Sequence, residues 1–433
     1  MTTATEMTTM HESSLTQKQR EEVVDAIGKV VAEKFCGPDL MELEWEAVLT
    51  TRRPTIVAAP TDEAFERGVG ELLQELKSSH VGFYHTGLRR CTGKMVLGAT
   101  YAEFIEGQNP KWVFQDVHEG GPAAKAGIKS GDVLLAVAGV SFQPPDHPLF
   151  AMGSTAAITV QRGERKFPVL VSIPMVKVKR NQLPKIEPNP IVSRQIIDAE
   201  TGYVKIASYP GMVGIDVARD ISEAVAALGP IKRLIFDLRG NPGGGIGVLR
   251  VMSLLTPDRR VVGVFLKGSL KNVTQIPEGG FVFDKIPSGK LTSLSLAARF
   301  FAKQCFAKLT KKKMPIVVMT EGCGGRDFHS KVVLLVNRHT ASANEMLLKF
   351  AREHKLAVIV GEATPGRVRG GSKFFLPHGY WLALPVGAFQ TSDGDSIEGN
   401  PIAPDVESLY RPEEARAGSD TQLEMAIKTV SQL

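Results

Sequence analysis

Apolar residues recur every three or four positions in two N-terminal segments, a spacing typical of amphipathic helices. The first segment runs from Leu15 to about Phe35 and is followed by the helix-ending pair Gly37–Pro38. The second runs from Thr61, a residue type that caps helices well, to about Lys77. Residues 1–88 are therefore predicted to form a small helical domain.

The pattern then changes to short alternating runs, which predict β-strands. KWVFQDV alternates, DVLLAVAGV is apolar and β-rich, and AAITVQRG with KFPVLVSIP predicts a hairpin around Arg162–Gly163. GGPAAKAG predicts a single helical turn bounded by Gly and Pro. Residues 89–178 are therefore predicted to form a β domain, followed by the Pro-, Lys- and Asn-rich linker VKRNQLPKIEPNP.

Strands and helices alternate in residues 179–433. GYVKIASY, RLIFDLRG, VVLLVN and AVIVGE predict strands, whereas GIDVARDISEAVAAL, the segment from Val248 to Leu255 and ANEMLLKFARE predict helices. This alternation is typical of α/β layers. We therefore expect a multidomain α/β protein whose largest domain follows a small helical domain and a β domain.

Composition supports a folded chain and argues against several classes of protein. Of 433 residues, 43% are apolar and 23% charged, as in globular proteins generally. The net charge of +6 is mild, and the basic residues are scattered apart from Lys311–Lys313, interpreted as a solvated helix end. Nucleic acid is therefore not an expected partner.

The cysteines and the N-terminus bear on metal binding and location. The four cysteines, Cys36, Cys91, Cys305 and Cys323, share no metal-ligand spacing, so free thiols and no metal site are expected. No stretch approaches the ~20 apolar residues that span a bilayer, and the N-terminal residues lack a signal-peptide core. The chain as numbered is expected to be cytoplasmic, and exported only if a signal was removed before residue 1.

Ser342 lies where an apolar strand, ending at Asn337, gives way to a helix. A serine there is commonly an N-cap. It is also well placed for a nucleophile, because the free N–H groups of the first helical turn can meet an oxyanion. This stretch alone leaves both interpretations open.

A glycine-rich turn, DLRGNPGGGIG, follows the strand RLIF. Glycines adopt positive φ and let backbone amides point into a site, so Gly243 or Gly244 could donate to an oxyanion. A tight strand–helix connection or a phosphate loop would use similar residues. The phosphate loop is disfavoured because neither the Lys-Ser/Thr pair nor the G-x-G-x-x-G order is present.

A hydroxyl nucleophile needs a base within hydrogen-bond reach. Among the nine histidines, His80 stands at the end of the helical domain in SSHVGFYH, and His85 and His339 are its rivals. Glu398, on the Gly- and Pro-bounded loop DSIEGNPIAPD, is a candidate to orient the imidazole.

Taken together, GYVKIASY, DLRGNPGG, VNRHTASANEML, VGEATPGR and EGNPIAPDVE resemble the motifs of peptidase family S41. This family contains the C-terminal processing (tail-specific) proteases, the tricorn core and interphotoreceptor retinoid-binding proteins. The resemblance implies a ClpP/crotonase-like α/β domain that hydrolyses peptides or unfolded proteins, often near their C-termini, without metal or organic cofactor. Crotonase-like folds often assemble, which leaves a homo-oligomer open.

The middle segment VHEGGPAAKAGIKSGDVLLAVAGV resembles a bacterial PDZ signature. The resemblance places a carboxylate-binding loop at Val96, Leu97, Gly98 and Ala99, where a peptide would add as a strand. QPPDHPLFAMGSTAA leaves little room for the long second helix that walls such a groove, so a gate or spacer is an alternative role.

The family uses two catalytic arrangements. The tail-specific branch pairs serine with a lysine, but the matching position in TPGR is Arg367, which cannot act as a base. The tricorn branch uses a Ser-His pair and a glutamate, which match Ser79–His80 and Glu398. The resemblance therefore implies Ser342, His80 and Glu398 as catalytic residues with Ser79 in support.

The same resemblance implies an oxyanion hole from Ala343 with Gly243 or Gly244, and structural roles for Glu362 and Arg367. A non-catalytic binder of the same fold is the alternative function. The insertion at about 269–310, with its amphipathic half Leu294–Phe306, is expected to cover the site or form an oligomer contact.

Overall fold

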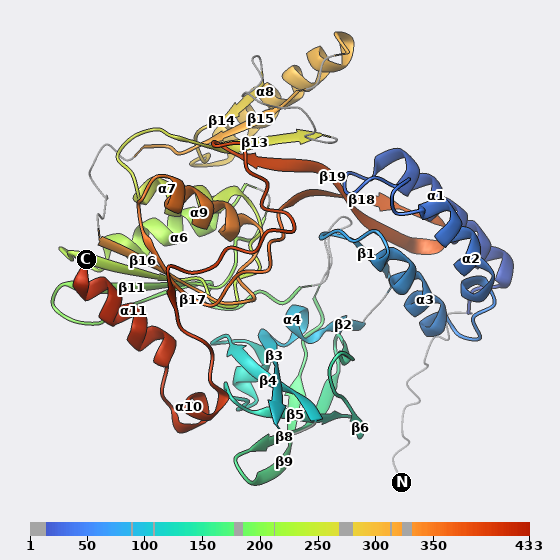
Figure 1. Ribbon diagram of the computed structural model, residues 1–433, viewed down its shortest axis with the longest axis horizontal. Helices are drawn as coiled ribbons and strands as arrows, with labels where there is room; N and C mark the ends of the chain where they lie inside the picture. Colours follow the sequence, from blue (N-terminus) through green and yellow to red (C-terminus); the bar gives the residue numbers. More distant parts are fainter. Residues whose placement is uncertain are drawn as a thin grey trace, which may run out of the picture. The chain divides into compact units, whose positions relative to one another are not determined.

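The computed structural model describes residues 14–87, 90–106, 109–176, 185–211, 213–267, 280–311, 314–322 and 331–433. The chain forms two compact units, one of residues 1–87 with 371–386 and the other of residues 88–370 with 387–433 (Figure 1). The three-domain division at 1–88, 89–178 and 179–433 stays a prediction. The sequence did not predict that residues 371–386, which lie near the other end of the chain, belong to the N-terminal unit.

The first unit packs three helices on strand segments. Thr61 caps its third helix through a bond from Ala64 N–H to its side chain (3.1 Å), as its sequence position predicted. Apolar helix residues pack with Leu376, Tyr380, Leu382 and Leu384. The elements are α1 (Gln17–Lys34), α2 (Trp45–Val57), α3 (Asp62–Gln74), β1 (Gly82–His85) and η2 (Pro377–Gly379), with the larger parts of β18 (Arg369–Phe375) and β19 (Tyr380–Thr391). Strand β1 pairs antiparallel with the first residues of β19.

The PDZ-like segment of the second unit is a strand layer with two short helices. Its sheet has the order β3-β4-β5-β8-β9, with β6 on β5, and β2 pairs with β7. The predicted hairpin turns between Arg162 and Arg165, which are paired in register. The elements are β2 (Arg90–Thr92), α4 (Gly93–Val96), β3 (Ala99–Glu106), β4 (Asn109–Val117), α5 (Pro122–Lys125), β5 (Val133–Val137), β6 (Val140–Ser141), β7 (Leu149–Ala151), β8 (Thr155–Arg162) and β9 (Arg165–Ser172).

The rest of the second unit is built on a sheet of order β10-β11-β12-β16-β17-β20, parallel from β11 onward. Alternate residues face opposite layers: Phe236 and Leu334 pack with α6, α7 and α9, and Ile235 and Val333 pack with α11. This explains why the central strands are apolar at nearly every position. The strands are β10 (Val192–Ile196), β11 (Thr201–Ile206), β12 (Arg233–Asp237), β16 (Lys331–Val336), β17 (Val358–Gly361) and β20 (Val406–Glu407).

The helices of these layers and a smaller group of strands complete the unit. Strand β13 pairs antiparallel with β15 and with the last residues of β19, and β14 pairs parallel with β15. The elements are α6 (Ile215–Ala226), η1 (Ile246–Val248), α7 (Leu249–Leu254), β13 (Val261–Lys267), β14 (Phe281–Phe283), α8 (Lys290–Leu309), β15 (Ile316–Met319), α9 (Ala343–Glu353), α10 (Pro412–Ala417) and α11 (Thr421–Gln432). The predicted multidomain α/β class is confirmed.

Other sequence predictions have plain outcomes. Cys36 and Cys91 are buried free thiols and Cys305 is an exposed one, whereas Cys323 lies outside the described residues. The linker is described only from Lys185 onward, and the first part of the 269–310 insertion also lies outside the described residues. Across the described ranges, none of the helices combines the length and the apolar character needed to cross a membrane.

Candidate active site

Two turns meet at one edge of the main sheet because β12 and β16 are parallel neighbours in register. The glycine-rich turn leaves the carboxyl end of β12, and the Ser342 turn leaves the carboxyl end of β16. Ala341 N–H and the Asn344 side-chain amide both donate to Asn241 O, at 3.1 and 3.0 Å. The two turns are therefore fixed to each other at the edge where parallel sheets usually bind ligands.

Ser342 has an unusual backbone for the residue before a helix. Its φ of 57° and ψ of −115° differ from the extended conformation of an ordinary N-cap. A non-glycine residue there is strained, and such strain concentrates at functional sites. Within its unit the half-buried Ser342 hydroxyl forms no hydrogen bond to the described residues. The capping interpretation of its side chain therefore loses its support.

Glu345 fixes the turn in place of the serine hydroxyl. Its side chain is fully buried and accepts the N–H of Ser342 (2.9 Å). The same carboxyl group accepts the Thr364 hydroxyl at 2.7 Å, Gly366 N–H at 2.6 Å and Arg367 N–H at 2.8 Å. It thus ties the Ser342 turn to the TPGR motif. Glu345 was not among the residues predicted from the sequence, although the S-x-x-E spacing of a capping box marks its position.

The glycine turn lies directly against Ser342. Gly243 has φ of 88°, and a Cβ there would lie 2.6 Å from Ala341 O and 2.8 Å from Ala343 N and Ser342 Cβ. Only glycine fits such a position. Its own N–H donates to Asn241 Oδ1 at 2.8 Å, so it is engaged. The N–H groups of Gly244 and Ala343 form no hydrogen bond with described residues of this unit, which leaves them able to bind a ligand oxygen.

Glu398 lies beside the segment that follows the TPGR motif. Its Oε2 accepts Val368 N–H at 2.9 Å, and its Oε1 lies 3.8 Å from Arg369 Nε. Its side chain is only 11% exposed. Arg367 is exposed and contributes its backbone N–H to Glu345.

In the first unit, Ser79 Oγ and His80 Nδ1 lie 2.7 Å apart. His80 has φ of 61°, a second strained non-glycine position. A Cβ at Gly371 would lie 3.8 Å from His80 Cβ, so the histidine borders the start of the unit's second segment. The Ser79 hydroxyl is therefore within hydrogen-bond distance of one of the two ring nitrogens of His80.

The two rival histidines have other partners. His85 Nε2 lies 2.9 Å from His378 O, and Gly87 N–H donates to His85 Nδ1 at 3.1 Å, so backbone groups engage both ring nitrogens. Burial lowers the pKa of His339 to about 4, partly offset by Asp116 and the Tyr101 carbonyl of the PDZ-like segment. The ring of His85 is therefore held by backbone groups. His339 interacts with Asp116 and Tyr101 of the PDZ-like segment.

The PDZ-like loop lines a small cavity together with the glycine-rich turn. Val96, Leu97, Gly98 and Ala99 are buried, and Leu97 O and Gly98 O accept Ala123 N–H and His118 N–H (both 2.9 Å). The cavity lined by Gly98, Ala99, Gly240 and Pro242 has a volume of about 20 Å³. That is room for about one water molecule.

Polar contacts join the PDZ-like segment to the chain around the Ser342 turn. Asn337 Nδ2 donates to both oxygens of Asp116, at 2.9 and 3.0 Å, and Gln115 Nε2 donates to Glu362 Oε2 at 2.8 Å. Arg338 reaches the other oxygen of Glu362 at 3.1 Å. Glu362 therefore links Gln115 of the PDZ-like segment to Arg338, which follows β16.

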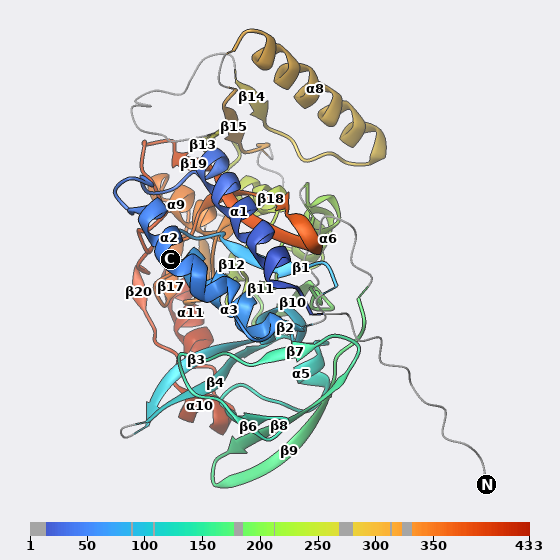
Figure 2. The same ribbon diagram turned by 90° about the vertical axis from the view of Figure 1, so that its right-hand side faces the viewer.

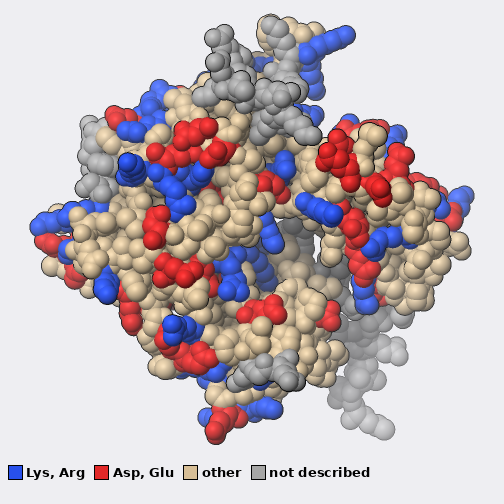
Figure 3. Space-filling view, in the orientation of Figure 1, with Lys and Arg blue, Asp and Glu red and all other residues tan. Residues whose placement is uncertain are grey.

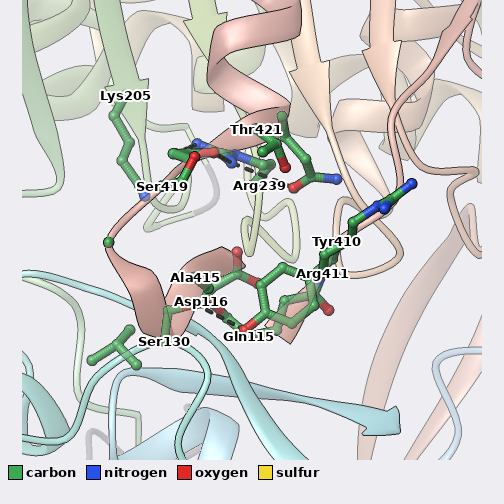
Figure 4. A pocket seen from close by; sticks show the side chains of 14 residues that line it. Gln115, Asp116, Ser130, Lys205, Arg239, Tyr410, Arg411, Ala415, Ser419 and Thr421 are labelled. Atoms are coloured by element: carbon green, nitrogen blue, oxygen red, sulfur yellow. Dashed lines mark hydrogen bonds and ion pairs between the residues drawn. The ribbon is translucent and has the colours of Figure 1, made fainter. Parts of the chain in front are cut away.

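A larger polar pocket of about 260 Å³ is lined by residues of β4, α10 and the start of α11 (Figure 4). Lys205 and Tyr410 border it, and Arg239 is bonded there to Asp237 and Asp420. None of the predicted site residues lines it. Among the described residues, no group of three or more His, Cys, Asp or Glu side chains is arranged to hold a metal ion.

Comparison with known proteins agrees with this arrangement. Residues 200–408 match the model of peptidase family S41, and residues 113–162 match that of PDZ domains. Tricorn protease homolog 1 of Streptomyces coelicolor is 23% identical over 430 residues, covering 94% of this chain and 34% of that protein. The carboxyl-terminal-processing protease of Picosynechococcus sp. is 24% identical over 314 residues, covering 70% of this chain and 63% of its own.

Among solved structures, the photosystem II D1 C-terminal processing protease matches with a TM-score of 0.54 and 18% identity, covering 95% of this chain and 97% of that one. This similarity shows the fold. The chain spans about a third of the tricorn homologue and less than two thirds of the carboxyl-terminal-processing protease. Residues 200–408 are thus similar to peptidase family S41, and residues 113–162 before them are similar to PDZ domains.

Proposed function

We propose that this protein is a serine peptidase that hydrolyses peptide bonds in peptides or unfolded proteins, with Ser342 as nucleophile, His80 as base and Glu398 as the group that orients it. The observation that carries the proposal is the Ser342 turn. A strained serine keeps its hydroxyl unbonded within its unit because Glu345 caps the helix, and unengaged N–H groups lie in the adjoining turn. A serine that merely capped a helix would need none of these features.

Chain connectivity supports the pairing of His80 with Glu398. Glu398 accepts the N–H of Val368, and His80 borders Gly371. Three residues of extended chain span at most about 11 Å. The covalent chain therefore sets an upper limit on the separation of the carboxyl group and the imidazole, and this limit does not depend on how the two units are placed.

In the proposed mechanism His80 Nε2 takes the Ser342 proton as the hydroxyl attacks the peptide carbonyl. The imidazolium then protonates the leaving amine, and water hydrolyses the acyl-enzyme by the same route. Glu398, directly or through Ser79, holds the ring and stabilises its positive charge. Arg367 takes no part as a base, since a guanidinium keeps its proton.

The oxyanion of the tetrahedral intermediate would be bound by the N–H groups of Ala343 and Gly244. One such donor contributes about 2.7–4 kcal/mol in a studied protease. Gly243 has a different part, since its N–H is already bonded to Asn241 Oδ1. Its lack of a side chain lets the glycine turn approach the nucleophile.

Casein hydrolysis by the full chain and its variants tests this proposal. Ser342→Ala and His80→Ala are each expected to reduce kcat by at least about a thousandfold. The wild-type rate should fall on the acid side with an apparent pKa near ~6.5, the ordinary histidine value. His85→Ala is the matched control and should keep its activity if folded.

Full activity in His80→Ala would refute the histidine assignment. Absence of hydrolysis by the wild type, together with saturable binding of a peptide or an apolar ligand, would favour the alternative of a non-catalytic binder.

A further inference from the structure

Helix α8 has two apolar faces, only one of which packs against the protein. The packed face consists of Ser293, Leu296, Phe300, Gln304 and Ala307, which are half-buried at helical spacing. Leu296 and Phe300 pack against the core of the second unit, and the Phe300 ring lies edge-on to Phe281 of β14 at 5.2 Å. Figure 2 shows α8 along the outer side of β14 and β15. This face anchors the helix.

The opposite face is apolar and exposed. Five of the sixteen exposed large apolar residues of the described chain lie on this one helix, and each of them is 64–84% exposed: Leu291, Leu294, Phe301, Phe306 and Leu309. At about 100° per residue they occupy an arc of roughly 140°. Proteins that remain free in solution rarely concentrate apolar surface in this way.

The charge on α8 is of one sign. The helix contains Lys290, Arg299, Lys303 and Lys308 and no acidic residue, and Lys311 follows it. Arg299 lies over the Phe281 ring at 5.9 Å, and Lys303 Nζ donates to Gly280 O at 3.4 Å. In Figure 3 the outer end of α8 shows basic side chains (blue) and no acidic ones (red).

The positions of these charges indicate what kind of partner binds the exposed apolar face. On the helical wheel Lys290 and Lys308 lie at one border of the apolar arc and Arg299 at the other. Cations that flank a convex apolar face are typical of helices lying in the headgroup region of a membrane. A second copy is a poorer occupant, because two helices without acidic residues would bring like charges together.

We propose that α8 binds the surface of an anionic lipid bilayer. Its Leu and Phe side chains would enter the boundary between headgroups and acyl chains, while Lys290, Lys308 and Lys311 would face lipid phosphates. This adds an interaction surface to the protein and does not depend on its catalytic chemistry.

Vesicle flotation of the full chain tests the proposal. Binding is expected to phosphatidylcholine vesicles that contain phosphatidylglycerol, much less to phosphatidylcholine alone, and to weaken as salt rises. Phe301→Ser should weaken partitioning roughly tenfold, the value of losing one large apolar side chain. Lys290→Gln and Lys308→Gln should each weaken it about fivefold.

The control is Ile105→Ser, which removes a side chain that is 69% exposed on β3, and it should leave binding unchanged. Equal binding by Phe301→Ser and wild type would overturn the proposal. So would equal binding to both kinds of vesicle, or a dimer in light scattering that Phe301→Ser converts to a monomer without any vesicle binding.

Discussion

Helices α9 and α8 belong to the same unit, and they differ in what they bury. Helix α9 buries polar Asn344 and Glu345 along with its apolar residues, whereas α8 buries none of its residues and exposes Leu and Phe. Buried polar groups and exposed apolar groups are the informative departures from ordinary packing. In α9 the polar groups fix the turn that carries Ser342, and in α8 the apolar groups mark a surface for binding.

A matched pair of phenylalanines tests this comparison with the largest effect. Phe350 on α9 is 1% exposed and Phe301 on α8 is 65% exposed. Phe350→Ala is expected to lower the free energy of unfolding by about 3–5 kcal/mol through loss of burial and a cavity. Phe301→Ala should change it by less than about 0.5 kcal/mol. Urea denaturation measures both, and equal losses would contradict the comparison.

Glu345 is expected to have the next largest effect on stability. Glu345→Ala leaves four donors of the Ser342 turn and the TPGR motif without their acceptor, which should cost at least about 3 kcal/mol of unfolding free energy. Glu164→Ala, on the exposed β8–β9 turn, is the control and should be within about 0.5 kcal/mol of wild type. A small effect at Glu345 would mean that another group fixes the turn.

A comparison of Gly243 with Gly163 distinguishes the effect of steric crowding from the effect of backbone strain. Both have positive φ, but a Cβ at Gly163 meets nothing within 4 Å, whereas one at Gly243 meets three atoms of the Ser342 turn within 2.8 Å. Gly243→Ala should cost about 1–3 kcal/mol more than Gly163→Ala in thermal or urea unfolding, because the new methyl overlaps that turn. It should also reduce peptidase activity, which Gly163→Ala should leave intact.

His339 gives the smallest expected effect, a dependence of stability on pH. Burial lowers its pKa from 6.5 to about 4, so the unfolded chain binds the proton more readily than the folded one. Stability should therefore fall as pH decreases from about 6.5 toward 4. Asp116 also has a lowered pKa, but its contribution is lost only below 3.8. His118, likewise with a pKa lowered by burial, adds to the loss in the histidine window.

His339→Gln should flatten that slope in part, as measured by urea denaturation at pH 7 and pH 5. An unchanged slope would assign the whole effect to His118 and to other titrating groups.

The sequence predicted most elements of the α/β layers because their apolar periodicity is local and strong. The helix from Thr61 was predicted together with its cap. Helix α2 was missed, since Pro54 interrupts its pattern and Gly37–Pro38 read as the end of helical structure. The pairing of β1 with β19 was missed because nothing local in Gly82–His85 specifies a partner about 300 residues away.

At the site, sequence motifs selected Ser342, but only the fold showed how its turn is held. Glu345 and Asn241 act through hydrogen bonds to backbone atoms, and such contacts leave little trace in residue spacing. The engagement of the Gly243 N–H likewise depended on the conformation of Asn241. The assignment of His80 and Glu398 still rests on the family pattern and on chain connectivity.

The central claim is that Ser342 is an activated nucleophile, and covalent labelling tests it most directly. The full chain would be treated with a fluorophosphonate probe, digested and analysed by mass spectrometry. The account predicts one adduct on the peptide that contains Ser342, absent in Ser342→Ala and strongly slowed in His80→Ala. An adduct that persists in Ser342→Ala, or a wild-type protein in which Ser342 stays unlabelled, would contradict it.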